Sequence, residues 1–226
     1  MVAGGIRPEY VALADHLEFL RGAYALPCTT RHRADVTTTL SAFECIDRHY
    51  DGLSAGGPRR ELGAQIVHML GGAEETLPAE LEAHVRALRA VFAAHGASAR
   101  LAELLAEFFV ATERVRGTPE PSEYVDQVRR EGHLTSAMVL LLLEPDRSGR
   151  FARFFLRLGV VGNFVDKLVD VRDDHAQGET SVSPTLGVHA RLLAELMRAA
   201  VPLVLEFPRR LALARWGVGV TARLLR

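Results

Sequence analysis

The chain has 226 residues, of which 48% are hydrophobic and 24% charged, and its formal net charge is -1 at pH 7. A globular chain of this size buries one sizeable core, so we expect a single domain over residues 1–226. The near-neutral charge argues against a nucleic-acid partner.

Three features predict a cytoplasmic protein. No apolar run reaches the ~18 residues of a membrane span. The first ten residues, MVAGGIRPEY, lack the basic and apolar regions of a signal peptide. Two cysteines, Cys28 and Cys45, fit a reduced compartment better than a disulfide framework.

Helical periodicity recurs along the chain, whereas period-two alternation and hairpin turns are not found, so the predicted fold class is all-α. Pro8 suits the first turn of a helix that runs to about Ala23, followed by a break at residues 26–30. A second helix is predicted over residues 34–53, with a stop at Ala55-Gly56-Gly57-Pro58. Three more helices are predicted at 59–70, 78–95 and 97–116.

The helix at residues 34–53 carries two aspartates on its apolar side. The apolar stripe consists of Val36, Leu40, Phe43 and Tyr50. Asp47 and Asp51 project from that stripe, where a core residue belongs, while Cys45 faces away from them and packs. Carboxylates in such a place need a basic partner, a raised pKa or a bound cation.

Residues 122–143 form a helical pattern with Tyr124 on its first turn. Gly132 interrupts the pattern just after Arg129 and Arg130, and a glycine there costs about 1 kcal/mol relative to alanine. One explanation is a local break that exposes the backbone and the small residues 135–136 to a ligand. The other is a plain turn between two short helices, and the sequence leaves both open.

Residues 148–175 form a helix, ended near Gly178, in which four aspartates follow an apolar run. Asn163 and the acids share one broad sector: Asp166, Asp170, Asp173 and Asp174. Gly159 and Gly162 lie on or beside the same sector and would admit a bulky ligand. The neighbouring sector is expected to pack against a core through Val161, Val165, Leu168 and Val169.

The remaining residues, 184–226, read as two helices split near Pro202 or Pro208, each apolar on one side. The other side is rich in arginine: Arg191, Arg198, Arg209, Arg210, Arg215 and Arg223. Such a face is usually solvated, and it would also suit peripheral contact with an anionic membrane surface.

The two acid motifs, D-x-x-x-D at Asp47–Asp51 and D-x-x-x-D-x-x-D-D before Gly178, resemble those of the class I terpenoid synthases. The second motif is similar to that of squalene and phytoene synthases. The helices around both motifs also look like those of bacterial terpene cyclases of the tetraprenyl-β-curcumene synthase type. The resemblance covers residues 36–179, and the chain is short at its C-terminal side for squalene and phytoene synthases.

The resemblance implies a helical bundle with a central cavity and a Mg²⁺-dependent lyase that ionises a linear prenyl diphosphate and converts the carbocation to a cyclic or rearranged terpene. The implied catalytic acids are Asp47, Asp51, Asp170 and Asp174. The implied Mg²⁺ ligands, for several ions, are these four with Asp166 and Asp173. Tyr124, Arg129 and Arg130 would contact the diphosphate or the rest of the substrate.

Aromatic side chains would line the cavity of such an enzyme and stabilise a carbocation. The candidates are Phe43, Phe108, Phe109, Tyr124 and Phe155. Glu44 or Cys45 stands where squalene and phytoene synthases usually have an arginine, which counts against head-to-head coupling of two prenyl diphosphates. Coupling remains one alternative, and a non-catalytic isoprenoid-binding protein is another. The sequence leaves the oligomeric state open.

Overall fold

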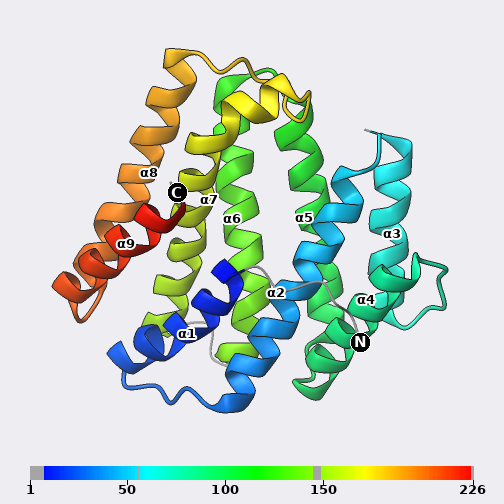
Figure 1. The fold of residues 1–226 in the computed structure, drawn as a ribbon, viewed down its shortest axis with the longest axis horizontal. Coiled ribbons are helices and arrows are strands. Elements are labelled where there is room, and N and C mark those ends of the chain that lie inside the picture. Colours follow the sequence, from blue (N-terminus) through cyan, green and yellow to red (C-terminus); the bar gives the residue numbers. More distant parts are fainter. Residues whose placement is uncertain (1–7, 55, 145–148, 225–226) are drawn as a thin grey trace. The chain divides into compact units, whose positions relative to one another are not determined.

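The computed structural model describes residues 8–54, 56–144 and 149–224, and within these ranges its regular elements are nine helices without a strand. The all-α prediction is therefore confirmed for the described part of the chain (Figure 1). In chain order the helices are α1 Pro8–Ala23, α2 Thr30–Asp51, α3 Gly57–Gly71, α4 Ala79–Ala94, α5 Ser98–Gly117, α6 Pro121–Leu143, α7 Arg150–Ala176, α8 Leu186–Glu206 and α9 Arg210–Leu224.

The helices group into two compact units. The first contains the described residues of Met1–Gly22, Pro27–Val110 and Ala137–Pro145. The second contains those of Ala23–Leu26, Ala111–Ser136 and Asp146–Arg226. Two of the boundaries between the units fall inside α5 and α6. The prediction of a single domain stays a prediction.

In the first unit, α2 packs against α4, and α3 contacts both helices. The buried side chains of α4 recur at intervals of four and three residues, as a helix with one apolar face requires: Leu81, Val85, Leu88 and Phe92. Buried Arg21 of α1 also ties this unit together, because its guanidinium donates to the carbonyl oxygens of Pro27 and Leu143.

The second unit is built on α7, α8 and the part of α6 before residue 137. α7 and α8 run side by side, and α9 packs against α8 (Figure 1). A buried cluster holds these helices together: Val115, Tyr124, Val125, Val128, Val160, Phe164, Val171, Val182, Val188 and Leu192.

Helix α2 begins four residues earlier than predicted because Thr29 caps it. The Thr29 hydroxyl accepts a hydrogen bond from the backbone N–H of His32 at 3.1 Å. In return, the His32 ring nitrogen Nδ1 accepts one from the backbone N–H of Thr29 at 3.2 Å. This is a capping box in which histidine replaces the usual glutamate or glutamine.

The other boundary predictions have different outcomes. Helix α6 is continuous through Gly132, so the predicted interruption is wrong. The C-terminal helices divide at Pro208, and Pro202 lies inside α8. The predicted helix start at Ser148 and the stop residue Ala55 lie outside the described residues.

In the described ranges, no helix combines the length and the apolar character that crossing a membrane requires.

Candidate functional site

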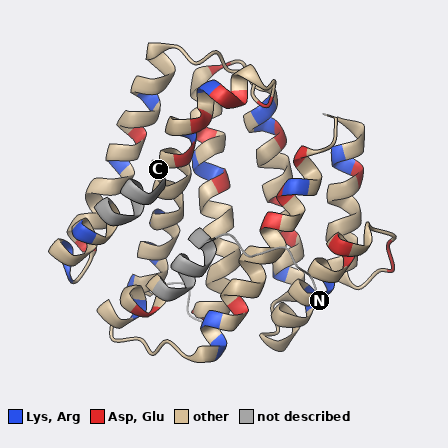
Figure 2. Ribbon diagram, viewed as in Figure 1, with Lys and Arg blue, Asp and Glu red and all other residues tan. Residues whose placement is uncertain are grey.

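Acidic residues gather in the second half of α7, which belongs to the second unit (Figure 2). Asp166, Asp170 and Asp174 follow one another at four-residue spacing, about one turn apart. Asp166 is exposed, as is Asp173, whereas Asp170 and Asp174 are half-buried. Burial and the charges of Asp166 and Asp174 raise the pKa of Asp170. A cation placed on this row would relieve that repulsion.

The apolar side of α7 differs from the predicted one. Val169 is 50% exposed, and Val161, Val165 and Leu168 are only half-buried. The buried side chains are instead Val160, Phe164 and Val171, which belong to the core of the second unit. The prediction failed because valines and leucines occur on several sides of this helix, so spacing alone did not identify the side that meets α6 and α8.

Lys167 is a partly buried positive charge within the acid row. Its ammonium lies 3.0 Å from a carboxylate oxygen of Asp174, and both side chains are about one-fifth exposed, at 21% and 18%. Burial works against the charge of Lys167, but Glu131, Asp174 and Asp166 outweigh it and raise the lysine's pKa. Lys167 is the only lysine among the 27 basic residues of the chain, a signal in the sequence that was overlooked.

Glu131 of α6 anchors a buried hydrogen-bond network beside Lys167. Its carboxylate accepts from the Thr112 hydroxyl at 2.6 Å and from the Asn163 amide at 3.2 Å. The Asn163 amide also donates to the backbone carbonyl of Val128 at 2.7 Å. Glu131 is 7% exposed. The sequence analysis missed this residue, because a glutamate that follows two arginines looks like part of a solvated face.

Tyr124 is fully buried, and its ring belongs to the core of the second unit. Its hydroxyl makes no hydrogen bond with any described residue. Burial is the main cause that raises its pKa, and the nearby acids Asp174 and Glu131 add to this effect against the opposing charge of Lys167. The hydroxyl therefore stays protonated beside the polar network. Its O–H donates no hydrogen bond to a described residue.

The two arginines proposed to contact a diphosphate differ in their surroundings. Arg129 donates to Asp126 and to Glu195, each at 2.6 Å. Burial opposes its charge, but these two carboxylates raise its pKa. Arg130 is exposed. Arg129 is thus already neutralised by acids of the same unit.

Gly132 and Gly159 mark the place where α6 and α7 touch. A Cβ added to Gly132 would lie 2.6 Å from the carbonyl oxygen of Gly159 and 2.8 Å from Cβ of Asn163. A Cβ on Gly159 would lie 1.6 Å from Oγ of Ser136. Gly132 therefore permits close helix packing and does not break α6, and Gly159 leaves no room for a ligand. A Cβ added to Gly162, in contrast, would meet no atom of another part of the chain within 4 Å.

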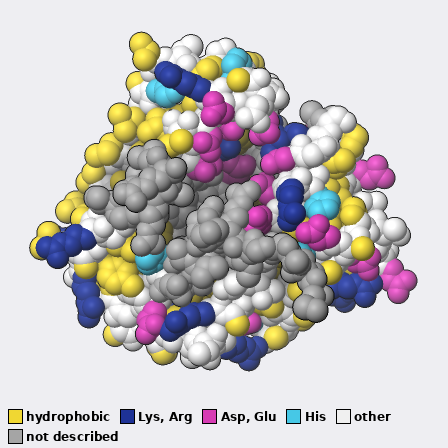
Figure 3. Space-filling model, viewed as in Figure 1, with side chains coloured by type: hydrophobic (Ala, Val, Ile, Leu, Met, Phe, Trp, Pro, Cys, Tyr) yellow, Lys and Arg dark blue, Asp and Glu magenta, His cyan; other side chains and the backbone are white. Residues whose placement is uncertain are grey.

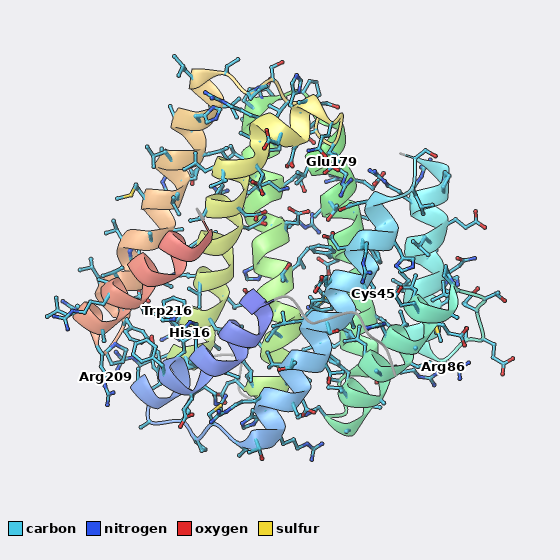
Figure 4. All side chains as sticks on the ribbon, viewed as in Figure 1. His16, Cys45, Arg86, Glu179, Arg209 and Trp216 are labelled. Atoms are coloured by element: carbon cyan, nitrogen blue, oxygen red, sulfur yellow. The ribbon has the colours of Figure 1, made fainter. Side chains whose placement is uncertain are left out.

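The acids of α2 belong to the first unit. Asp47 is exposed and Asp51 is half-buried, so the prediction that both occupy core positions is wrong for Asp47. The buried face of α2 includes Ala42, Cys45 and Ile46, which agrees with a packing role for Cys45 (Figure 4).

Buried Arg59 was not identified from the sequence. It donates to the backbone carbonyls of Leu53 and Asp51, at 3.0 and 3.4 Å. Its guanidinium also lies 5.8 Å from the centre of the Tyr50 ring. A positive charge is thus fixed next to the end of α2 that carries Asp51.

The aromatic residues predicted to line a cavity are mostly packed. Phe109 stacks on Tyr50 with ring centres 5.0 Å apart, and Phe108 meets Phe109 edge-on. Tyr124 and Phe155 are buried in the second unit, while Phe43 is half-buried in the first. These contacts are those of core residues.

The carboxylates of α7 are chemically suited to Mg²⁺, which prefers hard oxygen ligands. In the described residues, no three His, Cys, Asp or Glu side chains converge as a metal site. Mg²⁺ sites commonly use one or two carboxylates, with water and substrate phosphates completing the shell. Asp166 and Asp170 fit that pattern, whereas Asp174 is held by Lys167.

Comparisons with protein-family models, with curated proteins and with solved structures each returned no match.

Proposed function

We propose that the protein is a Mg²⁺-dependent class I terpene synthase that ionises a linear prenyl diphosphate and forms a cyclic or rearranged terpene. The main support is the carboxylate row of α7, in which burial together with Asp166 and Asp174 raises the pKa of Asp170. Carboxylates crowded in this way gain from a bound divalent cation. The all-α fold is also the class that such a synthase requires.

In this proposal, Asp166 and Asp170 bind Mg²⁺, which supplies positive charge to the diphosphate leaving group. Lys167 holds Asp174 in place, and the network around Glu131 and Asn163 fixes the adjoining turns of α6 and α7. The role of Asp47 and Asp51 as further ligands rests on their sequence motif alone. The role of Asp173 as a ligand also rests on its sequence motif alone.

A non-catalytic isoprenoid-binding protein is the second candidate. One observation favours it: Asp174 already has a cation, Lys167, at 3.0 Å. A lysine that neutralises part of an acid row lowers the need for metal at that point. Such a protein would bind a prenyl chain without turnover.

The test is incubation of the full chain with geranyl, farnesyl or geranylgeranyl diphosphate and Mg²⁺, followed by analysis of the organic extract. Cyclic or rearranged products with unchanged carbon number support the synthase. Products of doubled carbon number would show head-to-head coupling instead. No product, together with a copurifying isoprenoid, would favour the binding protein.

The carboxylate variants test the site directly. We expect Asp170→Asn and Asp47→Asn to abolish turnover with helicity unchanged in far-UV circular dichroism. Glu103→Gln, an exposed acid of α5 outside both motifs, is the matched control and should keep full activity. Binding of Mn²⁺, measured by electron paramagnetic resonance, should weaken at least tenfold in Asp170→Asn. Full activity in both motif variants would exclude these acids as ligands.

A further inference from the structure

Helix α8 exposes a continuous apolar stripe on the side that faces away from the core of its unit. The inner side is buried through Val188, Leu192 and Leu203. The outer side carries large apolar residues that are between 47% and 86% exposed: Leu186, Leu193, Met197, Val201 and Leu205. Their spacing of seven and four residues puts them on one face of the helix. Figure 3 shows hydrophobic side chains gathered along α8, at the left of the view.

Arginines border this stripe. Arg191 and Arg198 are exposed on α8, and Arg209, Arg210 and Arg215 are exposed at the α8–α9 turn and on α9. Figure 4 marks Arg209 at the turn. Leu211, next to these arginines, is 80% exposed. The stripe and the turn thus combine exposed apolar residues with positive charge.

The nearby acids cancel only part of this charge, that of Arg198. Glu195 is 14% exposed and accepts from Arg129 at 2.6 Å and from Arg198. Glu206 pairs with Arg157 at 2.5 Å. Both carboxylates are therefore engaged, and the α8–α9 turn remains rich in arginine.

A polar pocket of about 190 Å³ lies at the C-terminal end of α8, lined by Tyr24, Arg150, Arg153 and Glu206. Arginine pairs are common phosphate ligands, because the guanidinium donates two parallel hydrogen bonds. Burial raises the pKa of Tyr24 to about 12, so its hydroxyl remains a donor at neutral pH. The pocket suits a phosphate headgroup much better than a prenyl chain.

We infer that the outer face of α8 and the α8–α9 turn dock the protein on a membrane surface rich in anionic phospholipid. The apolar stripe enters the boundary between headgroups and acyl chains, and the arginines contact lipid phosphates. A second copy of the chain is the less favourable occupant. A two-fold interface would bring the same arginine-rich surface against itself.

The experiment is cosedimentation of the full chain with vesicles of phosphatidylcholine, with or without phosphatidylglycerol. We expect binding to the anionic vesicles only, and weaker binding at high salt. Arg209→Gln and Arg210→Gln should each weaken binding about fivefold, the factor expected for one basic residue near an anionic surface. Inorganic phosphate at the same concentration as the lipid should not compete, because it lacks the acyl chains.

Val201→Glu tests the stripe, and Val110→Glu is its matched control. Val201 on α8 is 47% exposed and Val110 on α5 is 50% exposed. Val201→Glu should weaken vesicle binding about tenfold or more, from the loss of a buried valine and the cost of a buried charge. Val110→Glu should bind like the unchanged protein. Circular dichroism confirms that both variants are folded.

Two sets of results would overturn the inference. One is equal binding to both kinds of vesicle, or no binding to either. The other is a dimer in light scattering that Val201→Glu separates into monomers, because a second copy would then cover the stripe. Neither set depends on whether the protein turns over a prenyl diphosphate.

Discussion

Lys167 and the acids around it form a charge cluster whose balance depends on one ammonium group. We expect Lys167→Met to lower the free energy of unfolding by about 1–3 kcal/mol, less than a fully buried pair because both partners are partly exposed. Urea denaturation measures this change. Arg86→Met, which removes an exposed i,i+4 pair with Glu82, is the control and should change stability by under about 0.5 kcal/mol. Equal effects would show that Lys167 has no special role.

Asp170 gives a pH dependence of known sign. Its pKa is raised in the folded state, so between the ordinary aspartate pKa of about 4 and the raised value the folded protein binds more protons than the unfolded one. The contribution of Asp170 to stability is therefore largest at low pH and is lost as the pH rises through the raised pKa.

It follows that, without Mg²⁺, Asp170→Asn should melt at a higher temperature than the unchanged protein at pH 7, and that the difference should disappear on acidification. Thermal unfolding followed by circular dichroism across the acid range tests this. A lower melting temperature for Asp170→Asn at pH 7 would contradict the cause assigned to the shift.

Removal of the Tyr124 hydroxyl tests whether this group contributes to stability or to function. The hydroxyl is buried without a hydrogen bond to any described residue, so Tyr124→Phe should leave stability unchanged or raise it by up to about 1 kcal/mol. If the hydroxyl contacts substrate, the same variant will lose turnover while keeping its stability. A loss of more than about 1 kcal/mol in urea denaturation would indicate a partner in the folded protein.

The contact between α6 and α7 depends on glycine at two positions. Gly159→Ala would force a Cβ against Ser136 and against the carbonyl of Gly132, so we expect a loss of about 2–4 kcal/mol. Gly162→Ala, on the same helix, meets open space and should gain about 0.5–1 kcal/mol from helix propensity. Denaturant unfolding of the two variants measures both values, and a stable Gly159→Ala protein would show that the helices can move apart.

The helices themselves could be predicted from the sequence, because apolar spacing and the turn residues Gly and Pro recur at their ends. The structural role of Gly132 could not be predicted from the sequence. A glycine within a helical pattern is expected both where a helix breaks and where two helices pack closely. Pro202 was equally ambiguous, and it lies inside α8. Whether such a residue breaks a helix or lies inside one depends on what packs against it. The spacing of residues in the local sequence carries no information about that packing.

The candidate site was predicted in part. The acids of α7 do form a row, but their partner Lys167 and the buried Glu131 beside it were missed. Glu131 lies 32 residues from Asn163 in sequence, and only the fold brings the two together. Asp47 was predicted at a core position and is exposed, because α2 turns Cys45 and Ile46 to the core instead.

For the whole chain, the division into two units carries a prediction about unfolding. Two of the unit boundaries fall inside α5 and α6, where each helix continues without a linker. Because helix formation is cooperative along a continuous segment, we expect one transition in urea. The single tryptophan, Trp216, reports on the second unit, and far-UV circular dichroism reports on all helices. Two separate midpoints from these probes would show independent units.

Because Lys167 is the chain's only lysine, amine chemistry can address the acid row at a single point. An acylating reagent has one lysine side chain to modify besides the N-terminal amine, and peptide mass spectrometry distinguishes the two products. Reaction requires the neutral amine, so the ion pair with Asp174 keeps the rate slow. Any ligand that draws Asp174 away from Lys167 would accelerate acylation of the lysine. The acylation rate of Lys167 therefore reports whether a ligand is bound at the acid row.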